Sequence, residues 1–245
     1  MPIQWSEGSI VRQQDSEHAF IRSVEFRLNW QWVLVICRFV PDRYQPSMFT
    51  AMKIDMPASI RSADSKRQAE FLAGRYAAQQ GLKSMQQAGA SINQIPIGAG
   101  RDPQWPAGIR GSISHSGDRV CCLLSQSASV KFLGVDLEKI FSVELAQKIG
   151  YEIHTAAEQQ LLCKAGLSPA QASSVIFSAK ECLFKALYPH AKEFFGFEAA
   201  SVVEATTSFV SLGLSPDLVW LWGVPEQFTV HYQLHHDYLF TSLIG

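Results

Sequence analysis

Hydrophobic positions recur at helical spacing between residues 63 and 80, where Leu72 and Tyr76 fall on one face. This spacing predicts the first long helix of the chain, with Gly81 as its stop or kink. Earlier in the chain, the apolar run 30–40 is too short to cross a bilayer and predicts a buried strand.

Three more helices are predicted in the second half of the chain. They begin after Ser142, at Thr155 and at Ser168, and the last two carry a capping-box pattern. The helix that starts at Ser168 should run to about residue 187, because Pro189 disfavours helical geometry in the residue before it.

Short apolar runs bounded by turn residues predict strands in both halves of the chain. These runs lie around residue 113 and at 120–124, 132–137, 202–205, 208–212, 218–224, 228–234 and 238–243. Helices mixed with mostly antiparallel strands, rather than a regular strand–helix alternation, predict an α+β fold. A helix followed by strands occurs once on each side of residue 140, so we expect two similar halves, 1–140 and 141–245.

The composition is that of a globular protein. Of 245 residues, 47% are hydrophobic and 18% are charged, and the net charge of −1 provides no basic field for nucleic acid. The five cysteines form no CxxC pair, so reduced thiols in a cytoplasmic protein are expected rather than a zinc site. The first residues lack the basic start and apolar core of a signal peptide, and we expect no transmembrane segment.

The sharpest local signal is the sequence Gly-Val-Asp-Leu-Glu at residues 134–138. On a strand, Asp136 and Glu138 would project to the same side, while Val135 and Leu137 would face the core. Two neighbouring carboxylates repel each other unless a cation lies between them, and oxygen ligands of this kind suit Mg²⁺. The alternative is a solvated acidic strand edge.

A second signal is the sequence Phe-Ser-Ala-Lys-Glu-Cys-Leu-Phe-Lys at residues 177–185. Glu181 and Lys185 are four apart and share one face of the predicted helix. Taken alone, this pair is equally explained by an ordinary surface salt bridge.

A third signal is the pair Ser114 and His115, which follows a loop rich in glycine and proline at residues 89–111. Long irregular loops inside a compact domain are usually functional. His115 is either a phosphate contact or a histidine satisfied within the core. The sequence contains no G-x-S-x-G turn, P-loop or G-x-G-x-x-G motif.

In this order and spacing, the signals resemble the 4′-phosphopantetheinyl transferase superfamily, and within it the branch of enterobactin synthase component D. Residues 134–138 and 177–185 match its two metal and catalytic motifs, and residues 105–116 and 66–75 match runs of that branch. The resemblance covers about residues 60–190. Cys182 departs from the serine or alanine that is usual there, and cysteine is nearly isosteric with serine.

The resemblance implies a fold and an activity. It implies two similar halves, each a small mostly antiparallel sheet packed on helices. The implied enzyme transfers 4′-phosphopantetheine from coenzyme A to a serine of an apo acyl or peptidyl carrier protein and releases 3′,5′-ADP. Siderophore-type non-ribosomal peptide synthesis is the expected pathway, with fatty-acid and polyketide carriers as alternatives. A monomer is expected.

The resemblance also implies roles for individual residues. Glu181 would take the serine proton, directly or through a water, and Lys185 would neutralise the leaving phosphate. Mg²⁺, or Mn²⁺ as the alternative ion, would be held by Asp136, Glu138 and Glu181. The expected contacts to coenzyme A are Arg67, Arg75, Arg101, Ser114, His115 and Lys180.

Two other functions remain open at this point. A Mg²⁺-dependent hydrolase of a nucleotide pyrophosphate would use the same acidic residues without a protein acceptor. A binding protein that keeps affinity for coenzyme A would need no catalysis. Retention of all four residues Asp136, Glu138, Glu181 and Lys185 favours an enzyme over a binding protein.

Overall fold

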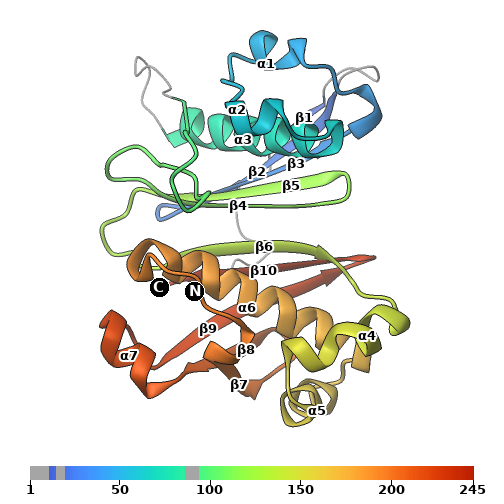
Figure 1. Ribbon diagram of the computed structural model, residues 1–245, viewed down its shortest axis with the longest axis vertical. Helices are drawn as coiled ribbons and strands as arrows, with labels where there is room; N and C mark the ends of the chain where they lie inside the picture. Colours follow the sequence, from blue (N-terminus) through green and yellow to red (C-terminus); the bar gives the residue numbers. More distant parts are fainter. Residues whose placement is uncertain (1–10, 15–19, 86–93) are drawn as a thin grey trace. The chain divides into compact units, whose positions relative to one another are not determined.

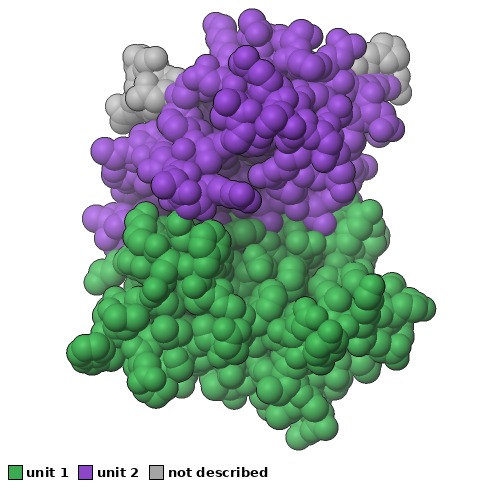
Figure 2. All heavy atoms as spheres, viewed as in Figure 1, with its two compact units in different colours: residues 1–3, 131–245 green, residues 4–130 purple. Residues whose placement is uncertain are grey.

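The computed structural model describes residues 11–14, 20–85 and 94–245. The chain divides into two compact units. The first in chain order lies within residues 4–130 (purple in Figure 2), and the second is formed mainly by residues 131–245 (green). The boundary comes before the predicted division at residue 140. The strand that carries Asp136 and Glu138 therefore belongs to the second unit, because it pairs with the last strand of the chain.

The first unit is a five-stranded antiparallel sheet covered on one face by a long helix (Figure 1). The sheet has the order β1-β2-β3-β5-β4, and helix α3, Ser65–Met85, packs across β3 and β5. The strands are β1 Val11–Gln14, β2 Ile21–Leu28, β3 Val33–Phe39, β4 Arg110–Ser116 and β5 Arg119–Ser125. Three short helical segments precede α3: η1 Pro41–Arg43, α1 Ser47–Ala51 and α2 Ala58–Arg61.

The second unit repeats this plan, with a five-stranded antiparallel sheet in the order β6-β10-β9-β8-β7. Its strands are β6 Leu133–Lys139, β7 Ala200–Ala205, β8 Phe209–Leu214, β9 Gln227–His235 and β10 Tyr238–Ile244. The long helix α6, Pro169–Ala191, packs on β6 and β10, and α4 and α5 pack on α6. The remaining helices are α4 Val143–Ile153, α5 Ala156–Lys164, η2 Phe197–Ala199 and α7 Pro216–Trp222.

The predicted fold class is confirmed, since each unit is an antiparallel sheet packed with helices. Both predicted capping boxes are present, with Thr155 and Glu158 at the start of α5 and Ser168 and Gln171 at the start of α6. The serine and threonine oxygens accept hydrogen bonds from helix amides that would otherwise have no partner. The described part of the predicted loop 89–111 contains one isolated bridge before β4 begins.

Three predictions about single elements are wrong. The predicted strand 218–224 is helix α7, whose start at Pro216 and left-handed end at Gly223 are helix signals that its apolar sequence obscured. Pro189 lies inside α6, which continues to Ala191, because a proline in the last turn removes only one terminal hydrogen bond. Gly81 does not end α3. A Cβ there would approach Leu124 Cδ1 to 2.6 Å, so glycine permits close packing on the sheet.

Each unit has its own hydrophobic cluster on the helix side of its sheet. In the first unit α3 contributes Leu72 and Ala77, and in the second unit α6 contributes Ile176 and Leu183. Among the described residues, no helix is long and apolar enough to cross a membrane.

Candidate active site

The first group of functional side chains lies between β6 and α6. Asp136 is 2% exposed, and both of its carboxylate oxygens accept hydrogen bonds from α6. Lys185 Nζ donates to Oδ1 at 2.6 Å and Ser178 Oγ donates to Oδ2 at 2.7 Å. Ser178 is also hydrogen-bonded to Thr241 on the neighbouring strand β10. Each oxygen of this buried carboxylate thus has a hydrogen-bond partner, one a cation and the other a hydroxyl.

Close approach of β6 to α6 makes these contacts possible. A Cβ atom on Gly134 would collide with the backbone carbonyl oxygen of Cys182, so only glycine fits at this point of the strand. Side chains alternate along a strand, so Gly134, Asp136 and Glu138 all face α6. Val135 and Leu137 are buried on the opposite face of β6, as predicted for core residues. They lie outside the hydrophobic cluster on the helix side of the sheet.

Glu181 lies on α6 beside this pair. Burial raises the pKa of Glu181, the nearby charge of Lys185 lowers it, and the charge of Asp136 raises it, with a net increase. Glu181 and Asp136 therefore lie close enough to repel each other. We call Asp136, Glu138, Glu181 and Lys185 the acidic centre: Lys185 contacts Asp136, both charges act on Glu181, and Glu138 shares a strand face with Asp136. Among the described residues, no group of three or more His, Cys, Asp or Glu side chains is arranged to hold a metal ion, so the ligand set Asp136, Glu138 and Glu181 stays a prediction.

The second group lines a cavity of about 410 Å³ within the first unit. This arginine cavity lies over α3 and β4, and the ionisable side chains in its wall are Arg67, Glu70, Arg75, Arg101 and His115. Arg67 and Arg75 are eight residues apart on α3 and so share a face, as predicted. Four of the five residues predicted in this unit to contact coenzyme A therefore line one cavity.

Arg75 is the most deeply placed cation of the arginine cavity. Its guanidinium Nε donates to the Ile95 carbonyl oxygen at 2.8 Å, and its Cζ lies 4.5 Å from the centre of the Phe71 ring. Burial lowers the pKa of Arg75 to about 10, and the charge of Arg67 adds to this decrease. A buried cation next to another cation is a favourable place for an anion.

The hydrogen bonds of His115 indicate its tautomer. Arg67 Nη1 lies 3.0 Å from His115 Nε2, and an arginine can only donate, so this ring nitrogen accepts. The other nitrogen, Nδ1, lies 3.8 Å from Glu70 Oε2. In this cavity, His115 is therefore hydrogen-bonded to Arg67 and is not an isolated imidazole.

Ser114 does not line the arginine cavity. It is the neighbour of His115 on β4, and adjacent residues of a strand point to opposite faces. The register agrees, because His115 lies opposite Val120 of the helix-side cluster, whereas Ser114 lies opposite Cys121, which is outside it. The two residues predicted to act together are therefore separated by the sheet.

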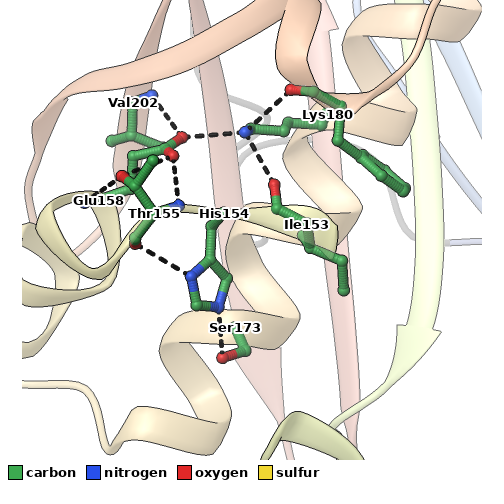
Figure 3. Close-up of polar contacts among 8 residues, drawn as sticks. Ile153, His154, Thr155, Glu158, Ser173, Lys180 and Val202 are labelled. Carbon is green, nitrogen blue, oxygen red and sulfur yellow. Dashed lines mark hydrogen bonds and ion pairs between the residues drawn. The ribbon is translucent and has the colours of Figure 1, made fainter. Parts of the chain in front are cut away.

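The ammonium group of Lys180 bonds to residues outside the acidic centre, although Lys180 precedes Glu181 (Figure 3). Its Nζ bonds to the carbonyl oxygens of Ile153 at 2.9 Å and Phe197 at 3.1 Å, and to Glu158 Oε1 at 2.9 Å. These three acceptors match the three donors of an ammonium group. The prediction that Lys180 contacts coenzyme A stays a prediction.

Glu158 gives the fold a specific dependence on pH. Burial alone would raise the pKa of Glu158, but hydrogen bonds from Thr155, Val202 and Lys180 lower it below the ordinary value of 4.5. Its ionised form therefore stabilises the fold above that value, and this stabilisation is lost as the pH falls through the folded-state pKa. We expect Glu158→Gln to be less stable than the unmodified protein at about pH 7 and to show a shallower loss of stability towards about pH 3.

Urea unfolding at several pH values measures this effect. Glu204→Gln, an exposed change on β7, is the control and should leave the pH dependence unchanged. Parallel stability curves for Glu158→Gln and the unmodified protein would show that Glu158 does not contribute in this way.

Comparison with known families matches both units. Residues 56–125 match the model of the 4′-phosphopantetheinyl transferase N-terminal domain, and residues 132–240 match that of the 4′-phosphopantetheinyl transferase superfamily. Enterobactin synthase component D of Escherichia coli K12 is 32% identical over 188 residues, which cover 75% of this chain and 80% of that protein. The chain belongs to the 4′-phosphopantetheinyl transferase superfamily.

Other relatives of this chain agree. Enterobactin synthase component D of Salmonella typhi is 35% identical over 158 residues, which cover 64% of this chain and 63% of that protein. This match thus spans less than two thirds of the Salmonella protein. The 4′-phosphopantetheinyl transferase PptT of Mycobacterium tuberculosis is 28% identical over 163 residues, covering 66% of this chain and 69% of that protein.

The two sites contain residues that the sequence did not single out. Glu70 and Ser178 lie inside the matched motifs and could have been considered there, since Glu70 follows Arg67 by three residues and Ser178 precedes Glu181 by three. Thr241 is placed by the pairing of β10 with β6, and no local motif indicates it. The capping role of Glu158 was predicted, whereas its contact with Lys180 was not.

Proposed function

We propose that this chain transfers the 4′-phosphopantetheine group of coenzyme A to a serine of an apo carrier protein, with release of 3′,5′-ADP. The observation that carries the proposal is the contact of Lys185 with the buried Asp136 next to Glu181, in the unit that matches the transferase superfamily. This arrangement supplies a cation for phosphate charge and a carboxylate with a raised pKa for proton transfer.

Each step of the transfer has a residue suited to it. Glu181 takes the proton of the carrier serine, directly or through a water, and its raised pKa favours this role. The serine oxygen forms a bond to the β-phosphorus, and the bond from that phosphorus to the oxygen bridging it to the α-phosphate breaks. Lys185 neutralises the charge that develops on the departing 3′,5′-ADP.

The carboxylates of the acidic centre are the kind of donor that Mg²⁺ prefers. Mg²⁺ in such enzymes usually takes one or two carboxylates together with substrate phosphates and waters. Asp136 and Glu181 repel each other across a partly buried space, and Glu138 faces the same helix, so added positive charge would stabilise them. When bound, the ion would supply charge beside the diphosphate, and Mn²⁺ accepts the same oxygen ligands.

The arginine cavity suits the phosphorylated adenosine end of coenzyme A. Arg67, Arg75 and Arg101 provide forked donors, and His115 provides a ring nitrogen in the same wall. The buried Arg75 has a carbonyl oxygen and an aromatic ring as its partners, so a phosphate would supply the negative charge that these lack.

The names of the relatives point to siderophore synthesis, because the proteins from Escherichia coli and Salmonella are enterobactin synthase components. We therefore propose a peptidyl carrier protein of a siderophore-type synthetase as the acceptor, with fatty-acid and polyketide carriers as the alternatives. Five free cysteines, four of them buried, support action in a reducing compartment such as the cytoplasm. The monomeric state stays a prediction.

Removal of the proposed base should abolish most of the activity. Glu181→Gln keeps the shape of the side chain and removes the proton acceptor, so we expect kcat for transfer to fall about 10²- to 10⁴-fold. The matched control is Glu226→Gln, an exposed change in the same unit, which should stay within about twofold of the unmodified protein. Near-normal turnover of Glu181→Gln would remove Glu181 from the mechanism.

The dependence of product release on the acceptor separates transfer from hydrolysis. The protein is incubated with coenzyme A and Mg²⁺, with or without an apo carrier protein, and 3′,5′-ADP is measured. A transferase releases 3′,5′-ADP only when the carrier is present. Equal release without the carrier would favour the pyrophosphate hydrolase.

A further inference from the structure

A buried ion pair in the second unit connects several segments that are separate in the sequence. The side chains of Lys180 and Glu158 are 5% and 6% exposed, and their charged atoms lie 2.9 Å apart (Figure 3). Buried charges are costly unless they are paired and hydrogen-bonded. The groups that bind this buried pair are therefore held in place.

Glu158 holds one side of this arrangement. Its Oε2 accepts hydrogen bonds from the Thr155 amide at 2.8 Å and from Thr155 Oγ1 at 3.0 Å. Its Oε1 accepts from the Val202 amide of β7 at 3.0 Å and from Lys180. The carboxylate therefore has fixed partners on α5, β7 and α6 and could not shift without losing several hydrogen bonds.

Lys180 extends the arrangement to the segment 194–197. Its ammonium donates to the carbonyl oxygen of Phe197, and the Phe197 ring lies 5.5 Å from that of Phe177 on α6. Phe194 and Phe195 in the same segment lie 5.6 Å and 5.0 Å from the ring of Phe184. Lys180 thus anchors the backbone of a segment whose rings pack along α6.

This aromatic segment forms a wall of a cavity of about 280 Å³. Lys180, Glu181 and Phe184 line the cavity from α6, and Phe194, Phe195, Gly196 and Phe197 line it from the segment. The ammonium group of Lys180 is bound by Ile153, Glu158 and Phe197, whereas Glu181 is the proposed base. Glu181, the proposed base, and Lys180, which binds the backbone of the opposite wall, are therefore neighbours in sequence.

We infer that the Lys180–Glu158 pair is a positioning device for the transfer reaction: it holds the aromatic segment 194–197 beside Glu181, and Lys180 does not itself bind coenzyme A. The inference rests on the proposed function. It assigns Lys180 a role different from the one expected from the sequence. It also makes Glu158, which lies outside the acidic centre, a residue on which catalysis depends.

Two single variants test the inference. Glu158→Gln and Lys180→Met should each lower kcat about 10- to 10²-fold, because a small displacement of a positioned group costs about that much. The KM for coenzyme A should stay within about twofold, since neither residue contacts it in this account. Lys164→Met, an exposed change at the end of α5, is the matched control and should leave both constants unchanged.

A double variant separates positioning from stability. Replacing both members of a buried pair with apolar residues often restores stability. We expect Glu158→Leu with Lys180→Met to melt closer to the unmodified protein than Lys180→Met does, while kcat stays low because the Phe197 carbonyl still lacks its donor. Recovery of kcat together with the melting temperature would show a merely structural role and overturn the inference. A tenfold rise in KM for Lys180→Met alone, with Glu158→Gln unchanged, would make Lys180 a ligand and overturn it equally.

Amide hydrogen exchange measures the positioning without any transfer. Exchange in residues 195–199 should be faster in Glu158→Gln and Lys180→Met than in Lys164→Met, because the anchor of this segment is lost. Unchanged exchange in both variants overturns the inference even if the unmodified protein is an active transferase. Absence of transfer by the unmodified protein would instead count against the proposed function.

Discussion

Replacing Asp136 with asparagine is expected to lower the rate of phosphopantetheine transfer about 10³-fold. One oxygen of Asp136 holds Lys185 and the other accepts from Ser178, so the amide removes the charge that keeps Lys185 beside Glu181. It also removes an oxygen ligand proposed for Mg²⁺. Single-turnover transfer to a carrier protein, measured by mass, reports the loss directly.

The control for this change is Asp118→Asn in the first unit. Asp118 also pairs with a cation, since its Oδ2 lies 3.0 Å from Arg38 Nη2, but the side chains of Arg38 and Asp118 are 47% and 36% exposed. Exposed pairs contribute little, so this variant should keep its activity within about twofold. A folded Asp136→Asn protein with more than about a tenth of the original rate would contradict the role given to Asp136.

Replacing Gly134 with alanine is expected to destabilise the protein by about 3 kcal/mol, the upper part of the range for overpacking. The added methyl group would collide with the carbonyl oxygen of Cys182, which is backbone and cannot rotate away. The strand and the helix would have to separate, and the Asp136–Lys185 contact bridges that boundary. Denaturant unfolding measures the cost, and the transfer assay should show a loss as well.

Gly74→Ala on α3 is the matched stability control. Its new methyl group would lie 3.3 Å from a side-chain methyl of Ile113, which can give way, and alanine is a better helix former than glycine. We expect a change within about 1 kcal/mol. Equal stability of Gly134→Ala and the unmodified protein would show that β6 and α6 are not held as closely as the structure indicates.

The motifs of the chain predicted the acidic centre because the relevant spacings are local. Asp136 and Glu138 share a strand face, Glu181 and Lys185 share a helix face, and Arg67 and Arg75 share another. What no spacing could show is the pairing of Asp136 with Lys185, which depends on the packing of α6 on β6.

The same periods also separate neighbouring residues that were predicted to act at one site. The alternation that places Asp136 and Glu138 together also separates Ser114 from His115, so their opposite faces were predictable. Lys180 precedes Glu181, and neighbours on a helix do not share a face. The partner of Lys180, however, comes from α5, and no pattern in the sequence links Glu158 to it.

The N-terminal part of the chain and segment 218–224 were predicted least well. Strand β2 was not predicted, and its burial is irregular rather than alternating, which weakens a strand signal. The helix α7 has an apolar, aromatic sequence typical of strands, with two strongly exposed side chains, Trp220 and Leu221. Pairing with β1 and β3 decides the structure of β2, whereas α7 has no buried residue and is set by its start at Pro216 and its left-handed end at Gly223.

Mass spectrometry of an apo carrier protein after incubation with this chain, coenzyme A and Mg²⁺ tests the central claim most directly. The account predicts a gain of one phosphopantetheine mass on the carrier, and no gain when the acceptor serine is replaced with alanine or when the chain carries Asp136→Asn. A carrier that stays unmodified across peptidyl, fatty-acid and polyketide types, with the chain folded and coenzyme A bound, would contradict it.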